Sequence, residues 1–178
     1  GTFNTLRHAY VHWAPTPRAI MTDPRFIDQS LLADLSAQAA ASPRKRKNHN
    51  FHAGNEAPCH RLLNALEMDS YIQPHRHLHP DKGETLIVVR GKLGALCFDA
   101  QGRITHKAVI AAGGGQIGLD TPAGVFHSFV ALEPGSVIFE AKAGPYEPVS
   151  EAERAPWAPL EQSPEGQAYL AWMRAQFE

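Results

Sequence analysis

The side chains best suited to chemistry in this sequence are histidines and acids near its middle. Ten of the 178 residues are histidine, and three of them stand close together in the stretch His75-Arg76-His77-Leu78-His79. Side chains at positions i and i+2 of a β-strand share one face, so His75 and His77 are expected to point the same way and to bind one metal ion together. Glu84 opens the next apolar run, and an antiparallel pairing would bring its carboxylate beside the two imidazoles.

A third imidazole is expected from a later strand. The turn in Pro122-Ala123-Gly124-Val125-Phe126-His127 launches a strand whose inward face would carry His127 and Phe129. A histidine buried among apolar neighbours needs a partner, because an unpaired buried polar group is costly. A metal ion is one such partner, and a hydrogen bond within the core is the alternative. The candidate metal ligands are His75, His77, Glu84 and His127.

Three imidazoles and one carboxylate suit a borderline divalent cation, so we expect one transition metal per chain, such as Fe, Zn, Mn or Ni. Four protein ligands leave one or two coordination positions open. An open position distinguishes a catalytic site from a closed structural one. Such an ion can polarise a carbonyl, orient two substrate oxygens, or activate water or dioxygen.

Short strands separated by turn residues must position these ligands. With 14 glycines and 14 prolines, the sequence favours many short elements over a few long helices. Strands are predicted at residues 59–67, 71–77, 84–90, 93–99, 103–110, 116–121, 125–132 and 136–142. No helix-length segment separates them, which predicts an all-β sandwich or barrel.

Helices are predicted on both sides of the strands. The spacing of leucines and alanines predicts a helix over residues 28–41. After the strands, Ser150 with Glu153 matches a capping box. Ser163 is expected to cap a second helix with Pro164 at its first position, and the apolar stripe that follows is typical of a packed helix. We therefore divide the chain into an extended N-terminal arm (1–26), a helix with a basic segment (27–55), a β-barrel (56–147) and a C-terminal helical segment (148–178).

The metal-ligand pattern resembles that of the cupin superfamily. His75-x-His77, Glu84 and Gly91 resemble the first cupin motif, and Pro122-x-Gly124-x-x-His127 resembles the second. The stretches at residues 42–52, 61–67 and 142–146 are similar to WbuC-type cupin-fold metalloproteins. The resemblance spans residues 26–159 and implies a cupin jelly-roll barrel with flanking N- and C-terminal helices around a mononuclear metal site.

The sequence departs from the cupin pattern at two places. Six residues separate His77 from Glu84, where the usual spacing is three or four, so His79 in the lengthened loop is an alternative ligand to Glu84. Ala131 stands where the second motif commonly has asparagine, which leaves the ligand set intact and removes a polar neighbour.

Other residues are expected to act on the substrate. Glu140 and Lys142 alternate with apolar neighbours on the last strand, so both can face inward as an acid–base pair, and an outward-facing surface pair is the alternative. Tyr71 is a third catalytic candidate. Arg61 is a candidate for binding an anionic substrate group, and Gln73 for hydrogen-bonding a ligand or simply filling space.

The run Arg44-Lys45-Arg46-Lys47 concentrates four of the 17 basic residues. Such a run is either a solvated surface or a tether for a phosphate or diphosphate beside the metal pocket. We select Arg44 and Lys47 as substrate-binding residues. Aromatic residues do not interleave with this run, which argues against nucleic-acid stacking.

Composition excludes several classes of protein. The net charge of −1 and a pI near 6.9 argue against a nucleic-acid binder. Apolar runs are far too short to cross a bilayer, and no basic stretch with a long apolar run resembles a signal peptide, so a cytoplasmic protein without a membrane partner is expected. Cys59 and Cys97 are expected to be reduced, buried thiols rather than a disulfide.

These features predict a metal-dependent enzyme acting on a small polar substrate, such as an isomerase or epimerase of a sugar or nucleotide-sugar. The resemblance to WbuC-type proteins, which are associated with surface-polysaccharide biosynthesis, implies the sugar class. An iron-dependent dioxygenase of a small molecule and a non-catalytic small-molecule-binding module are the alternatives. Cupins commonly pair through their sheets, and the proline-rich arm at residues 11–25 could lie across a neighbour, so a homodimer is predicted.

Overall fold

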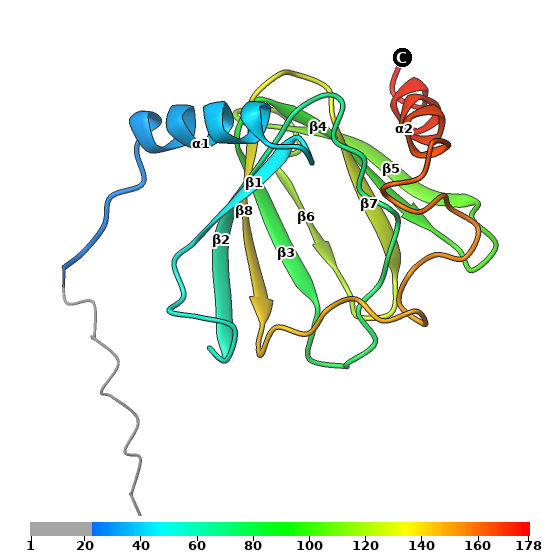
Figure 1. Ribbon diagram of the computed structural model, residues 1–178, viewed down its shortest axis with the longest axis horizontal. Coiled ribbons are helices and arrows are strands. Elements are labelled where there is room, and N and C mark those ends of the chain that lie inside the picture. The colour runs from blue at the N-terminus through cyan, green and yellow to red at the C-terminus, as the bar shows by residue number, and fades with distance from the viewer. Residues whose placement is uncertain (1–22) are drawn as a thin grey trace, which may run out of the picture.

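Two antiparallel β-sheets face each other, and one helix covers the outside of each (Figure 1). The computed structural model describes residues 23–178, so residues 1–22 of the predicted arm lie outside the described residues. The elements are α1 (Gln29–Ala41), β1 (Arg46–Asn50), β2 (Cys59–Leu66), β3 (Glu84–Arg90), β4 (Lys92–Phe98), β5 (Ile104–Ala111), β6 (Gly118–Thr121), β7 (Phe126–Ala131), β8 (Ser136–Ala143) and α2 (Gly166–Ala175). The predicted all-β jelly roll with flanking helices is confirmed.

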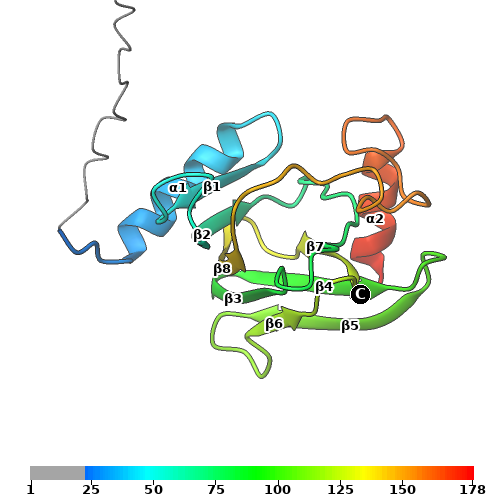
Figure 2. The ribbon, with the colours of Figure 1, turned by 90° about the horizontal axis from the view of Figure 1, so that it is seen from below.

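The sheet order explains how distant segments meet. The larger sheet runs β1-β2-β8-β3-β6 and the smaller one β5-β4-β7, so neighbours in space are rarely neighbours in sequence. Figure 2 shows the same arrangement from below, with α1 beside β1 and β2 on one side and α2 on the other. Alternation along β3 buries Leu86 and Val88 against Phe129 of β7 in the core between the sheets. Glu84, at the start of β3, lies on the same inward face.

The helices cover the outer faces of the sheets. Asp28 caps α1 by accepting a hydrogen bond from the Leu31 amide at 2.9 Å. Leu32, Leu35 and Ala39 of α1 pack on the larger sheet, and Leu170 and Met173 of α2 pack on the smaller one. Each helix therefore buries part of the outer face of its sheet, while outward residues such as Ile87 of β3 and Val109 of β5 stay exposed.

The two helix caps predicted in the C-terminal segment do not form as expected. Glu153 accepts hydrogen bonds from the backbone amide and the hydroxyl of Ser150, which is one half of a capping box. The other half is missing, because the Glu153 amide donates to the Ser150 carbonyl rather than to its hydroxyl, and only a turn follows. The prediction that Ser163 caps the last helix is wrong. Its hydroxyl donates to the Leu160 carbonyl, and α2 begins at Gly166.

The observed strands differ from the predicted ones at two places. The predicted strand at residues 71–77 forms only an isolated bridge at His75, because Pro74 has no amide hydrogen for a ladder and the far side of the segment pairs with the irregular residues 153–155. Strand β1 was not predicted, since its sequence Arg-Lys-Asn-His-Asn has no apolar alternation. The larger sheet therefore begins at Arg46 rather than at residue 56.

Two further expectations were tested by the described residues. Both cysteines are free thiols, as expected, but Cys59 is exposed and only Cys97 is buried. Neither of the two described helices has the length and apolar content that a membrane span requires.

Candidate metal centre

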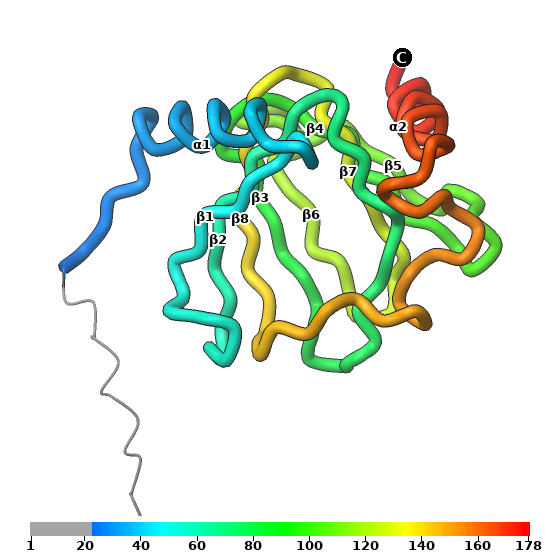
Figure 3. The backbone as a smooth tube through the Cα atoms, in the orientation of Figure 1, coloured from blue at the N-terminus to red at the C-terminus, as the bar shows by residue number. Residues whose placement is uncertain are grey.

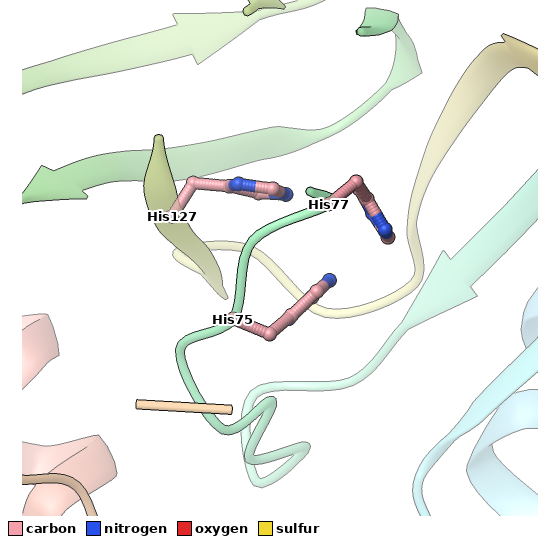
Figure 4. Close-up of side chains that lie close together, drawn as sticks. All are labelled: His75, His77 and His127. Atoms are coloured by element: carbon pink, nitrogen blue, oxygen red, sulfur yellow. The ribbon is translucent and has the colours of Figure 1, made fainter. Parts of the chain in front are cut away.

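Three histidines from two distant segments converge between the sheets. One ligand-type atom of each of His75, His77 and His127 lies within 4.8 Å of the other two. Figure 4 shows the three side chains turned toward a common space, His127 from β7 and the other two from the segment before β3. The ring centroids of His75 and His127 are 4.8 Å apart, and those of His75 and His77 are 5.2 Å apart. The predicted histidine cluster is therefore present.

Backbone hydrogen bonds place the two segments side by side. The His75 amide donates to the His127 carbonyl at 3.2 Å, and the His127 amide donates to the His75 carbonyl at 2.9 Å. The Gly124 amide donates to the His77 carbonyl at 2.7 Å, which extends the pairing beyond the start of β7. Figure 3 follows the chain of residues 67–83 from the end of β2 along β7 and on to β3.

Main-chain acceptors set the tautomer of two rings. Nδ1 of His75 lies 3.1 Å from the Gln73 carbonyl, and Nδ1 of His127 lies 2.9 Å from the Val125 carbonyl. A carbonyl only accepts, so both Nδ1 atoms carry the proton. The lone pair is then on Nε2, the tautomer that can bind a metal ion through that atom.

Glu84, the predicted fourth ligand, lies beside the histidine cluster. Its side chain is 6% exposed, its Oε2 lies 3.1 Å from Nε2 of His77, and its Oε1 lies 3.8 Å from Nε2 of His127. His79, the alternative ligand, is exposed and pairs locally with Asp81. Of the two alternatives, Glu84 lies beside the imidazoles and His79 does not.

Lys142 links Glu84 to a second buried acid. Its Nζ lies 3.3 Å from Glu84 Oε2 and 3.4 Å from Glu140 Oε1. The register explains the grouping, because Lys142 pairs with Glu84 and Glu140 pairs with Leu86 across β8 and β3. Glu140 and Lys142 therefore face inward beside the histidines, as expected from their alternation.

Burial and charge shape the protonation of these groups. Burial, followed by the nearby His127, lowers the pKa of His75 to about 4, and burial also lowers the pKa of His127. Burial and the charge of Glu84 raise the pKa of Glu140 to about 7. Burial acts to raise the pKa of Glu84, but the hydrogen bond from His77 and the charge of Lys142 outweigh it and lower that pKa. Near neutral pH the site thus holds neutral imidazoles at His75 and His127, an ionised Glu84 and a Glu140 that can exchange a proton.

A cavity of about 450 Å³ opens from this cluster. Its lining includes His75, Glu84, Glu140 and Lys142 on the side of the histidines. On the other side it reaches the basic run after α1. Both predicted substrate-binding residues of that run, Arg44 and Lys47, line it.

Three predicted site residues do not reach the cavity. The Tyr71 hydroxyl donates to the Pro159 carbonyl at 2.7 Å, and its ring packs in the core beneath α2. The Gln73 side chain donates to the Ala155 carbonyl at 3.3 Å. Ile72, between them, lines the cavity, so the inward face passes from Ile72 to His75 and the alternation breaks at Pro74.

Arg61 does not reach the cavity for a different reason. It pairs with Ala141 across β2 and β8, whereas its neighbours His60 and Leu62 pair with Lys142 and Glu140. Cross-strand partners share a face, so Arg61 lies on the face opposite Glu140 and is exposed. The sequence could not fix this phase, because Leu62 and Leu63 are both apolar.

Several lining residues were missed by the sequence patterns. Arg46 lines the cavity from the same basic run, and Tyr146 stands exposed at its edge. Asn48 and Asn64 face each other across β1 and β2. The unpredicted strand β1 explains the omission, since alternation along β1 puts Arg46 and Asn48 on one face.

An orphaned nitrogen tests whether these residues fit a metal ion. Nε2 of His127 is buried and has no hydrogen-bond partner among residues 23–178. Leaving a buried polar atom unpaired costs about 1–3 kcal/mol, and a coordinated cation would remove that cost. The donor set of three imidazoles and one carboxylate therefore fits a borderline divalent ion.

Comparisons with known proteins concern mostly the fold. A family model described as a domain of unknown function (DUF6016) matches residues 27–110. No curated protein matches the chain.

Several solved structures are similar to this chain. KdgF from Halomonas sp. is 17% identical with a TM-score of 0.46, over 60% of this chain and 84% of that chain. An RmlC-like cupin from Shewanella frigidimarina is 16% identical with a TM-score of 0.40, over 55% and 75%. A variant of the Bacillus subtilis oxalate decarboxylase OxdC is 17% identical with a TM-score of 0.43, over 57% and 29%. These similarities concern the fold, whereas the chemistry possible at the site depends on the side chains described above.

Proposed function

We propose that this protein is a mononuclear metal-dependent enzyme that isomerises or epimerises a small polar substrate, with a sugar or nucleotide-sugar as the leading class. The observation that carries the proposal is the buried, unpartnered Nε2 of His127, which faces His75, His77 and Glu84 at one end of a cavity. When bound, a divalent cation would polarise a carbonyl or orient two substrate oxygens. The sugar class is supported by the resemblance to WbuC-type proteins.

Glu140 is the residue best suited to move a proton. It lies buried in the cavity wall, and its pKa near 7 lets it both accept and donate a proton at neutral pH. Lys142 lies between Glu140 and Glu84, so it compensates negative charge that develops when Glu140 is ionised. This acid–base pair beside the candidate metal ligands supports isomerase chemistry, because isomerisation and epimerisation both move a proton at the substrate.

Elemental analysis tests the metal site directly. Protein purified without chelator and without nickel affinity resin is expected to contain about one divalent transition metal per chain. His77→Ala and His127→Ala should lose it, because each removes one ligand nitrogen. His106→Ala is the matched control, since His106 is exposed on β5 and bonds only to Thr105 in the structure. Equal metal content in all four proteins would rule out the site.

Turnover tests the reaction class. Metal-loaded protein is incubated with a panel of sugars and nucleotide-sugars in deuterated water, and solvent exchange at carbon is followed by NMR. Glu140→Gln should slow exchange by about 100-fold or more, since positioned proton transfer contributes that much. Glu133→Gln, on the exposed turn before β8, should not slow it. Absence of both turnover and binding across the panel would remove the sugar assignment, and oxygen uptake by the iron form but not the zinc form would indicate a dioxygenase.

A further inference from the structure

The cavity at the metal centre has two arms of different chemical character. The cavity of about 450 Å³ adjoins a smaller one of about 290 Å³, and four residues line both of them: Asn48, Glu140, Lys142 and Tyr146. Beyond these shared residues, the larger cavity reaches Arg44, Arg46 and Lys47, which we call the basic arm. The smaller cavity reaches Asn50, His52, Asn55 and His60, which we call the amide arm.

The basic arm carries more positive charge than its single acid can balance. Glu161 accepts hydrogen bonds from Nε and Nη2 of Arg44, at 3.0 and 3.1 Å, and also pairs with Nη2 of Arg46. Lys47 pairs with Ala65, so it lies on the face of β1 opposite Arg46, exposed at the edge of the cavity, and it forms no ion pair with any of the described residues. Three cations against one carboxylate leave two uncompensated positive charges at one end of a chain whose net charge is −1.

The bound carboxylate also orients the two arginines. Glu161 and the Tyr71 carbonyl together engage Nη2 and Nη1 of Arg46, whose side chain is 11% exposed. Nε of Arg46 and Nη1 of Arg44 have no acceptor within the described part of the chain. Oriented guanidinium donors beside a lysine match the several oxygens of a phosphoryl group, which carries about −1.5 to −2 charges at pH 7.

The amide arm contrasts with the basic arm because it is neutral. Its only charged lining residues, Glu140 and Lys142, pair with each other at 3.4 Å. His52 and His60 stack with ring centroids 4.0 Å apart, and burial lowers the pKa of His52, which keeps that ring uncharged. Amide and neutral imidazole groups both donate and accept hydrogen bonds, which suits hydroxyl groups.

One unpartnered atom supports a hydroxyl-bearing ligand. Oδ1 of Asn64 is buried without a hydrogen-bond partner among the described residues, although Asn64 lines the cavity opposite Asn48. An amide oxygen requires a donor, and neither a phosphoryl oxygen nor a carboxylate supplies one. A ligand hydroxyl does.

We infer that the substrate is a phosphorylated, hydroxyl-rich molecule whose phosphoryl group lies in the basic arm and whose uncharged hydroxyl-bearing part extends past Glu140 into the amide arm. This assignment rests on the proposed function for the reaction, but its two binding subsites do not require the metal. Both a sugar phosphate and a nucleotide-sugar contain the shared chemistry. In a nucleotide-sugar the base would extend outward from the basic arm.

Titrations of metal-free protein, followed by two-dimensional NMR, test the two arms separately. Inorganic phosphate is expected to shift signals of Arg44, Arg46 and Lys47, and free hexoses are expected to shift those of Asn50 and Asn55. A panel of hexose 1- and 6-phosphates should contain members that bind at least tenfold more tightly than the corresponding free hexose. Failure of every phosphorylated sugar to do so would overturn the inference.

A matched pair of variants tests the basic arm. Lys47→Gln should weaken the best sugar phosphate by about tenfold, the loss expected for one charge-assisted hydrogen bond, and should leave free hexose binding unchanged. Lys45→Gln makes the same change of charge two residues away, where the lysine donates to the Ala40 carbonyl outside the cavity. An equal effect of both variants would show a general charge effect and contradict the subsite.

The same experiment distinguishes the two possible sources of the phosphoryl group. It also distinguishes failure of this inference from failure of the proposed function. Tighter binding of UDP-hexose than of hexose phosphate would identify a nucleotide-sugar, and the reverse order a sugar phosphate. If the protein binds metal but no phosphorylated sugar, the proposed function stands and the assignment of the two arms is refuted. If the protein binds no metal but binds phosphate in a way that depends on Lys47, the basic arm stands and the proposal of a metal-dependent enzyme is refuted.

Discussion

Glu161→Gln should destabilise the fold by loosening the segment before α2 from the basic arm. In the structure Glu161 joins that segment to Arg44 and Arg46, which precede and begin β1. Glutamine keeps the size of the side chain and one acceptor oxygen but removes the negative charge. The change therefore isolates the ionic part of the link.

The two arginines contribute unequally to the expected loss. The Arg44 side chain is 60% exposed, so its pair with Glu161 is screened by water and is worth about 0–1 kcal/mol. The Arg46 side chain is 11% exposed, and removing one partner of a buried pair costs about 3–5 kcal/mol. Arg46 keeps the Tyr71 carbonyl at 3.2 Å as an acceptor and borders the cavity, which reduces that cost. We expect a total loss of about 2 kcal/mol, or about 4–8 °C in Tm for a chain of this length.

The loss should depend on pH with a definite sign. Burial acts to raise the pKa of Glu161, but the hydrogen bond from Arg44 and the charges of Arg46 and Arg44 outweigh it and hold that pKa below its ordinary value of 4.5. A depressed carboxyl pKa gives stability that is fully present above 4.5 and is lost as the pH falls through the folded-state pKa. The wild type and Glu161→Gln should therefore converge in acid.

Urea unfolding at pH 7 and at pH 3 measures both effects. Glu151→Gln is the control, because Glu151 is exposed in the turn after Ser150 and the same charge is removed there. A loss below about 0.5 kcal/mol at pH 7, a loss equal to that of the control, or a loss that persists undiminished at pH 3 would refute the reasoning.

Three further outcomes are expected. Zinc at 100 times its dissociation constant should stabilise the wild type by about 2.7 kcal/mol in thermal unfolding and should not stabilise His127→Ala; equal shifts would place the ion elsewhere. Gly94→Ala should cost about 1–3 kcal/mol, since the new Cβ would collide with the Phe177 ring, whereas Gly115→Ala meets nothing within 4 Å; similar Tm values for the two would contradict this packing. Light scattering at micromolar concentration should give the mass of a homodimer, and a monomeric mass would contradict that prediction.

The convergence of the candidate metal ligands could be predicted because their spacing follows simple geometry. His127 and Glu84 each lie on a strand with apolar neighbours on the same face, so period-two alternation suffices to turn them inward. His75 and His77 were placed correctly although their segment is not a regular strand. The backbone pairing of His75 with His127 replaces the ladder that the alternation implied.

The side of the cavity away from the histidines could be predicted only in part: Arg44 and Lys47 were expected there, but Arg46 and Asn48 were not. Strand β1 carries polar residues on both faces, and no sequence period identifies such an edge strand. Tyr71 and Gln73 were assigned to the inward face by extending the alternation through Pro74, where it breaks. For Arg61, the neighbouring leucines left the phase of β2 undetermined. Register set by tertiary contacts decides these three positions.

The orientation of the His75 and His127 rings has a consequence for which substitutions the chain tolerates. The acceptors that hold Nδ1 of His75 and Nδ1 of His127 are the carbonyls of Gln73 and Val125. Every amino acid carries that carbonyl, so replacing either side chain leaves the acceptor in place as long as the path of the backbone is kept. Substitutions of the side chains at positions 73 and 125 therefore leave the orientation of the two imidazoles unchanged. Only changes that bend the main chain there would disturb it.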